Sequence, residues 1–144
     1  MERIVKEQLE RVGPTENVVV KHDFPADLPP IRVDRVQIGQ VVLNLLSNAL
    51  QAMEGKGGTL TLRGRHNGNG SVKLDVIDTG VGMTREQLGK MFEPLYTTKA
   101  RGIGLGLAVS RSLAEANGAA ISAASEPGQG STVSVELPIA KGDS

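Results

Sequence analysis

The sequence predicts a two-layer α/β sandwich, in which a mixed, mostly antiparallel sheet carries its helices on one face. Five short segments are β-branched or alternate apolar with polar residues, and four of them pair into two hairpin patterns. Between them, apolar residues recur at helical spacing. The 144 residues are 39% hydrophobic and 22% charged, which suits one folded core with helices segregated to one side of the sheet.

We expect a helix over residues 1–13, a main domain over residues 14–138 and a frayed tail over residues 139–144. The first segment, MERIVKEQLERV, is amphipathic, and Gly13-Pro14 ends it. Its apolar side consists of Ile4, Val5, Leu9 and Val12. This helix belongs either to the main domain or to the end of a lost helical domain.

The first half of the main domain predicts a strand followed by a long helix. Asn17–Asp23 is rich in β-branched residues. Asp34 then stands where a helix N-cap is needed, and we expect the helix to run to about Met53. Three closely spaced glycines end it, namely Gly55, Gly57 and Gly58.

Two hairpins account for the other four strands. Thr59–Arg65 and Ser71–Asp78 flank the turn sequence His66–Gly70, which is rich in Asn and Gly. Ala119–Ser125 and Ser131–Leu137 form the second pattern.

Two further helices lie between the hairpins. Thr84 and Gln87 have the spacing of a capping box at the start of a short helix that runs to about Met91. Glu93–Gly104 predicts an irregular loop, and Leu105–Asn117 predicts a helix.

The charge balance excludes several classes of partner. Sixteen basic and sixteen acidic residues cancel, which argues against broad electrostatic binding of nucleic acid or of a membrane surface. There is no cysteine, and the two histidines, His22 and His66, stand apart from the motifs described below. No signal-peptide pattern or apolar run of transmembrane length appears, so we expect a soluble, cytoplasmic chain.

The long helix has an unusual polar side. From Val36 to Met53 there is no charged residue, and the arc outside the apolar stripe holds carboxamides. Asn44 and Asn48 are one turn apart on this arc. A carboxamide oxygen can ligate Mg²⁺ without adding negative charge beside phosphates. The alternative is that these side chains only hydrogen-bond the helix to a neighbouring loop.

Asp78 closes a strand and runs into Thr79-Gly80-Val81-Gly82. A carboxylate there can accept a hydrogen bond from an exocyclic amine such as that of adenine, and Gly80 and Gly82 allow close approach of the backbone. The alternative is an Asx-type turn between the strand and the next helix.

A glycine-rich segment, Gly102-x-Gly104-x-Gly106, opens onto a helix start, where backbone N–H groups favour phosphate. The alternative is a flexible hinge. Phe92 is expected to anchor the preceding loop in the core. The polar residues of that loop either contact phosphate or are merely solvated, and they are Thr97, Thr98, Lys99 and Arg101.

Together these motifs resemble the catalytic ATP-binding domain of sensor histidine kinases, the Bergerat fold shared with DNA gyrase and mismatch-repair ATPases. The residues NLLSNALQA resemble the N box, DTGVGM the first glycine box, FEPLYTTK the F box and GIGLGLAVS the second glycine box. Residues 128–132 resemble the last, weaker glycine motif. The residues of these motifs are most similar to those of the nitrogen-regulatory class of these kinases.

The resemblance implies that Asn48 is the Mg²⁺ ligand and that Asn44 lies near the metal and the phosphates, so both are implied to be catalytic. Gyrase-like ATPases hold a water-activating glutamate at the position of Asn44. Asparagine cannot act as that base, which favours phosphoryl transfer to a protein over hydrolysis.

The implied adenine contact is Asp78, with Thr132 near the adenine side. The whole implied ATP site consists of Asn44, Asn48, Gln51, Asp78, Gly80, Gly82, Met83, Thr98, Lys99, Arg101, Gly102, Ile103, Gly104, Leu105, Gly106, Leu107 and Thr132. Two positions depart from the family pattern. Many members have Lys or Arg where Gln51 stands, and Ser or Thr where Ile103 stands.

The implied function is to bind Mg-ATP and transfer its γ-phosphoryl to a histidine on a partner dimerisation and phosphoacceptor domain, which this chain lacks. A response regulator would be an indirect partner, and the parent protein could be membrane-anchored. The pair His22-Asp23 is rejected as the acceptor because it lies in a β-rich context. We expect the chain itself to be a monomer. The alternatives are an anti-sigma-factor-like serine kinase or binding module, and a degenerate nucleotide sensor.

Overall fold

A computed structural model describes residues 1–13, 17–53, 55–67, 70–90, 92 and 103–140. Nine helices and strands lie within this part of the chain. In chain order they are α1 (Glu2–Val12), β1 (Val18–Asp23), α2 (Arg35–Ala52), β2 (Gly58–His66), β3 (Ser71–Asp78), α3 (Arg85–Lys90), α4 (Ile103–Ala116), β4 (Ala120–Glu126) and β5 (Gly130–Pro138).

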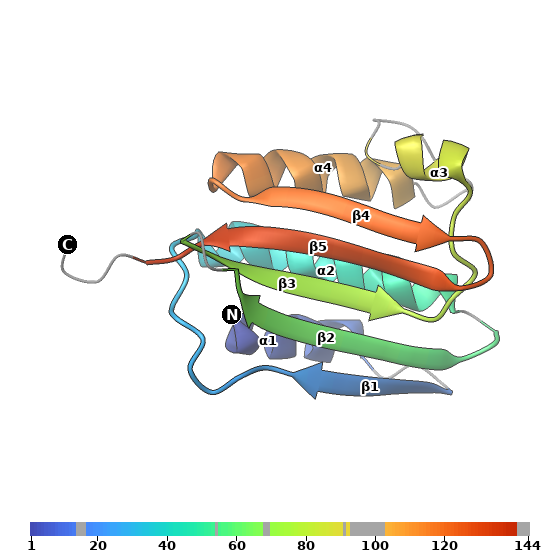
Figure 1. The fold of residues 1–144 in the computed structure, drawn as a ribbon, viewed down its shortest axis with the longest axis horizontal. Coiled ribbons are helices and arrows are strands. Elements are labelled where there is room, and N and C mark those ends of the chain that lie inside the picture. The colour runs from blue at the N-terminus through green and yellow to red at the C-terminus, as the bar shows by residue number, and fades with distance from the viewer. Residues whose placement is uncertain (14–16, 54, 68–69, 91, 93–102, 141–144) are drawn as a thin grey trace.

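The five strands form one mixed sheet in the order β1-β2-β3-β5-β4. Strand β1 is parallel to β2, whereas the other three pairings are antiparallel. Both predicted hairpins, β2–β3 and β4–β5, are confirmed. Figure 1 shows α1, α2 and α4 on the same face of this sheet, which confirms the predicted two-layer architecture.

The core lies between this face of the sheet and α2. The predicted apolar stripe of α2 is at most 2% exposed at each position, and it consists of Ile38, Val42, Leu45, Leu46, Ala49 and Met53. Alternate residues of the central strands face it, including Leu74 on β3 and Val135 on β5. Burial of these aliphatic side chains is the main force that holds the layers together.

Helix α1 contributes to the same core. Ile4 is 8% exposed and Val5 is fully buried. At the helix surface, Arg35 Nη2 donates to Glu7 Oε1 at 2.7 Å, which links α2 to α1. In the described chain α1 therefore packs against α2 and shares its apolar core.

The C-terminal end of the described chain is tied to the domain. Ile139 N donates to Gly70 O at 3.2 Å, and Ala140 N donates to Pro30 O at 2.8 Å. The expectation of a frayed tail from residue 139 is therefore wrong for these two residues, because the end of β5 reaches the β2–β3 turn. Residues 141–144 lie outside the described chain.

Both predicted helix starts that depend on side-chain capping are confirmed. Asp34 Oδ1 accepts hydrogen bonds from Val36 N at 2.9 Å and Gln37 N at 3.0 Å. At α3, Thr84 N donates to Gln87 Oε1 at 2.9 Å and Gln87 N donates to Thr84 Oγ1 at 3.1 Å, which is a reciprocal capping box.

Helix α4 begins earlier than the sequence pattern predicts. The pattern assigns Ile103 and Gly104 to the end of an irregular loop, but they form the first turn of α4. Glycine disfavours a helix by about 1 kcal/mol relative to alanine. Packing of the helix offsets this cost, since Leu107 is only 3% exposed and belongs to the core.

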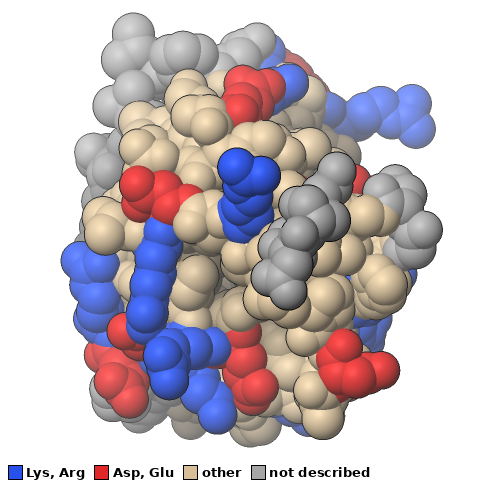
Figure 2. Space-filling view, turned by 90° about the vertical axis from the view of Figure 1, so that its left-hand side faces the viewer, with Lys and Arg blue, Asp and Glu red and all other residues tan. Residues whose placement is uncertain are grey.

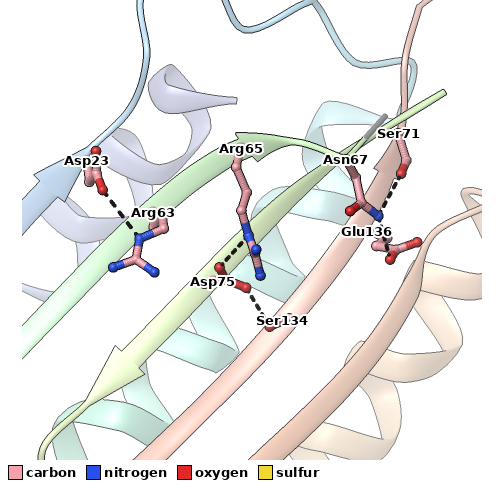
Figure 3. A network of polar contacts seen from close by, with 8 residues as sticks. All are labelled: Asp23, Arg63, Arg65, Asn67, Ser71, Asp75, Ser134 and Glu136. Carbon is pink, nitrogen blue, oxygen red and sulfur yellow. Dashed lines mark hydrogen bonds and ion pairs between the residues drawn. The ribbon is translucent and has the colours of Figure 1, made fainter. Parts of the chain in front are cut away.

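The face of the sheet without helices carries a polar network, shown in Figure 3. Asp75, which is 2% exposed, accepts hydrogen bonds from Arg65 Nε at 3.1 Å and Ser134 Oγ at 2.6 Å. Arg63 Nε pairs with Asp23 Oδ2 at 3.3 Å nearby. In Figure 2, basic and acidic side chains lie interspersed at the end of the molecule that includes the N-terminus. This pattern fits the zero net charge.

Candidate functional site

A seam of carboxamides and one hydroxyl joins α2 to α4. Near the start of α2, Gln37 Oε1 accepts a hydrogen bond from Asn117 Nδ2 at 2.8 Å. Further along, Asn44 Nδ2 donates to Ser110 Oγ at 2.9 Å. Gln37 and Asn44 are seven residues apart on α2, and their partners Asn117, the residue after α4, and Ser110 on α4 are seven residues apart in the opposite direction. The two helices are therefore antiparallel.

This register locates the predicted phosphate motif. One more step of seven residues leads from Asn44 to Gln51 on α2 and from Ser110 to Ile103, the first residue of α4. The C-terminal half of α2, with Asn48, is therefore level with the N-terminus of α4. Backbone N–H groups and the helix dipole at such an end attract anions.

The carboxamide of Asn44 is held at both ends. Its Oδ1 accepts from Gln40 Nε2 at 3.0 Å, and its Nδ2 donates to Ser110, which is fully buried. Asn44 thus has the hydrogen-bonding role that the alternative interpretation predicted. Its partners, however, lie on helices and not on a neighbouring loop. Gln40, Ser110 and Asn117 were missed because nothing in the sequence shows which helix faces the carboxamide arc.

Asn48 differs from Asn44. It is partly buried, and within the described part of the chain its side chain has no hydrogen-bond partner. A carboxamide in this position suits an oxygen ligand of Mg²⁺, which binds few protein groups and keeps phosphate oxygens and waters. The residues present therefore fit the metal that the family resemblance implies.

Asp78 ends β3 on the inner face of the sheet and is 4% exposed. Gly80 N donates to Asp78 Oδ1 at 2.8 Å, so the alternative of an Asx-type turn is observed. Burial raises the pKa of the Asp78 carboxyl, while the backbone N–H groups of Gly80 and Ser131 oppose that rise. Within the described chain no salt bridge offsets its charge.

The two glycines after Asp78 are needed for close backbone contact. A Cβ on Gly80 would lie 2.5 Å from Ala52 O, at the end of α2. Gly82 has φ +70°, and a Cβ there would overlap Glu126 O at the end of β4, where the β4–β5 turn begins. The first glycine motif is thus packed between α2 and that turn, which places Asp78 beside both.

The structure brings Ser131, and not Thr132, to Asp78. In the β3–β5 register Asp78 pairs with Ser131, whereas Thr132 pairs with Ile77. Paired residues point to the same side of a sheet and successive residues to opposite sides. Ser131, which is 7% exposed, therefore points to the same face of the sheet as Asp78, whereas Thr132 points to the opposite face. The sequence held a signal for this placement, since Ser131 is two residues before Val133 and four before Val135. Alternate residues of a strand share one face, so Ser131 belongs to the apolar face.

Met83 is fixed through its backbone. Its N–H donates to Ser125 Oγ at 2.8 Å, and this oxygen also lies 2.8 Å from Ser131 Oγ. Ser125 was missed as well, because a serine in a strand carries no motif of its own.

Phe92 packs against the core, as predicted, and the Arg111 guanidinium lies 5.6 Å from the centre of its ring. Gln51 is partly buried on α2, and Leu107 is buried in the core. The backbone of Ile103–Gly106 lies in the first turns of α4. The implied phosphate contacts Thr98, Lys99, Arg101 and Gly102, together with Thr97, lie outside the described residues.

The sequence profile of the family described as "Histidine kinase-, DNA gyrase B-, and HSP90-like ATPase" matches residues 33–141. The chain belongs to this family. The match begins just before the Asp34 cap of α2 and ends after β5, so it contains every site residue described above.

Curated relatives of the chain include a sensor histidine kinase and a sporulation kinase from two bacteria. The chain is 37% identical to the sensor histidine kinase ZraS of Escherichia coli strain K12, over 96% of this chain and 35% of ZraS. It is 37% identical to sporulation kinase E of Bacillus subtilis, over 85% of this chain and 16% of that kinase. The chain thus spans about a third or less of the length of these curated relatives.

Solved structures agree with this assignment. The mycobacterial sensor histidine kinase MprB superimposes with a TM-score of 0.81 at 25% identity, over 96% of this chain and 94% of that chain. The catalytic domain of the histidine kinase ThkA superimposes with a TM-score of 0.78 at 26% identity, over 96% and 92% of the two chains. Among the described helices, none is long and apolar enough to cross a membrane.

Proposed function

We propose that this chain is the catalytic ATP-binding domain of a sensor histidine kinase of the nitrogen-regulatory class. In this proposal it binds Mg-ATP and transfers the γ-phosphoryl group to a histidine of a separate phosphoacceptor domain, from which a response regulator receives it. The proposal is supported above all by the position of Asp78, a buried carboxylate at the end of β3 with no salt-bridge partner in the described chain.

Those groups proposed to bind ATP that belong to the described part of the chain lie around the C-terminal end of α2. Asp78 accepts a hydrogen bond from the adenine amine, with Gly80, Gly82 and Met83 shaping the pocket. The N-terminus of α4 and the glycine segment before it bind the phosphates. Gln51 completes the proposed phosphate contacts together with four residues of the preceding loop, namely Thr98, Lys99, Arg101 and Gly102.

Asn48 would hold Mg²⁺, which when bound neutralises charge on the phosphates. The contribution of the chain to phosphoryl transfer is then positioning and electrostatic stabilisation. Asn44 would orient the phosphates, but it cannot take a proton from water. This difference from a glutamate favours transfer to a protein side chain over hydrolysis.

Two alternatives predict different products. A serine kinase resembling anti-sigma factors would form acid-stable phosphoserine, and a degenerate sensor would bind nucleotide without transfer. The family match and the sensor kinase relatives do not favour the first alternative.

The proposal is tested first by calorimetric titration of ATP with and without Mg²⁺, on the wild-type chain and on Asp78→Asn. One-to-one binding that Mg²⁺ strengthens and that Asp78→Asn strongly weakens supports the proposal. Incubation with labelled ATP and a histidine-bearing helical domain then tests transfer, since phosphohistidine is labile to acid. Absence of binding by the wild-type chain would overturn the proposal.

A further inference from the structure

Ser125 lies at the point where three segments around Asp78 meet. Its Oγ accepts a hydrogen bond from Met83 N at 2.8 Å, contacts Ser131 Oγ at 2.8 Å and donates to Gly130 O at 3.0 Å. Met83 is the last residue of the first glycine box, whereas Gly130 and Ser131 begin β5. One hydroxyl at the end of β4 therefore holds the glycine motif against the neighbouring strand.

These contacts determine the direction of the hydrogen bond between the two serines. A hydroxyl has a single proton, and a carbonyl oxygen can only accept. Because Ser125 gives its proton to Gly130 O, the proton between the serines must come from Ser131. The Ser131 hydroxyl then has only its lone pairs to offer to any further partner.

The neighbouring Asp78 side chain also offers only hydrogen-bond acceptors. Asp78 and Ser131 are paired across β3 and β5, and both side chains lie on the helix-bearing face of the sheet. An ionised carboxylate is an acceptor only. This end of the sheet therefore offers two neighbouring acceptors and no side-chain donor from this pair.

We propose that Ser125 is a positioning residue that sets the base specificity of the nucleotide site by fixing Ser131 as a hydrogen-bond acceptor. The inference rests on the proposed function. The exocyclic amine of adenine has two N–H donors and suits two acceptors. Hypoxanthine places a carbonyl oxygen at the same position, and this oxygen would face acceptors and lose its hydrogen bonds to water.

The test compares the affinities of ATP and inosine triphosphate for the full chain, measured by calorimetry with Mg²⁺. In Ser125→Ala the Ser131 hydroxyl is free to rotate and donate to the inosine carbonyl. We expect the preference for ATP to fall about three- to tenfold, the value of one hydrogen bond. The control is Ser122→Ala, the same change on an exposed position of β4, which should keep the wild-type preference.

A role in stability alone would weaken both nucleotides equally, and an unchanged preference in Ser125→Ala would overturn the inference. Ser131→Ala provides a second route if that variant fails to fold. It removes the acceptor itself, so a wild-type preference in Ser131→Ala would also overturn the inference. In the Ser131→Ala background, adding Ser125→Ala should leave the preference unchanged, since Ser125 acts through Ser131.

The outcome for the wild-type chain separates this inference from the function on which it depends. Failure of the wild-type chain to bind ATP would overturn both. Normal ATP binding with an unaltered preference in Ser125→Ala would overturn the positioning role alone.

Discussion

Asn44 Nδ2 on α2 donates a hydrogen bond of 2.9 Å to the fully buried hydroxyl of Ser110 on α4. Because α4 begins in the second glycine motif, this contact links the helix that carries the proposed metal ligand to the helix whose N-terminus is proposed to bind phosphate. The orientation of the Asn44 carboxamide therefore depends on how α4 packs.

Replacing Ser110 tests this dependence. In Ser110→Ala the Asn44 amide loses its partner on α4, and we expect affinity for Mg-ATP to fall about three- to tenfold, with a loss of stability of about 1 kcal/mol. Calorimetry and urea unfolding measure the two effects. The control Gln37→Ala breaks a similar hydrogen bond two turns away on α2, to Asn117 just after α4, and should lower only stability. Equal affinity losses in both variants would show that Ser110 acts only through helix packing.

Asp78→Asn should weaken ATP binding while it stabilises the nucleotide-free chain. The variant loses a charge-assisted hydrogen bond to the adenine amine, which corresponds to about ten- to a hundredfold in affinity. At neutral pH it also removes a buried negative charge that has no salt bridge in the described chain, so the melting temperature without nucleotide should rise. A fall in the melting temperature would show that the ionised Asp78 carboxylate stabilises the fold instead.

The stability of Asp78→Asn relative to wild type should depend on pH. Burial raises the pKa of Asp78 above its ordinary value of 3.8. A raised pKa means that the folded chain binds the proton more tightly, so the wild-type stability from this group is complete below pH 3.8 and is lost as pH rises through the folded pKa. The advantage of the variant should therefore be absent in acid and grow toward neutral pH. Urea unfolding across this range measures it, and a constant difference would exclude Asp78 as its source.

Asn117→Ala should destabilise the chain by about 1–3 kcal/mol, because several polar groups lose their partner. Asn117 Oδ1 accepts from Asp34 N at 2.6 Å, and its Nδ2 donates to Gln37 Oε1 at 2.8 Å and to Leu113 O at 2.9 Å. Urea unfolding measures the change, and Gln37→Ala, which breaks only one of these bonds, should lose less. If the two variants lose the same stability, the bonds of Asn117 to Asp34 N and Leu113 O together contribute nothing.

Asp75→Ala should destabilise the chain without altering affinity for ATP. The variant leaves Ser134 buried without its acceptor and Arg65 without its ion pair, at a cost of about 1–3 kcal/mol. The network lies on the sheet face opposite the proposed site, so nucleotide affinity should stay unchanged. The matched control is Asp23→Ala, whose ion pair with Arg63 is largely exposed and should change stability by about 0.5 kcal/mol or less. A large effect of the control would show that the outer face is less solvated than its exposure indicates.

Local rules determined much of this protein from its sequence. The Asp34 cap and the Thr84–Gln87 capping box each depend on a few neighbouring residues, and both are confirmed. The two hairpins follow from alternation around turn residues in the same way. The ordered motifs were also sufficient for the family, since each is a short run of sequence.

Only the tertiary structure decided which side chains meet. The start of α4 at Ile103 depends on packing that outweighs the helix penalty of glycine. The partnership of Asn44 with Ser110 and that of Asp78 with Ser131 depend on how two helices and two strands are aligned. Such alignment results from burying the whole aliphatic core at once, and no local run of residues carries it.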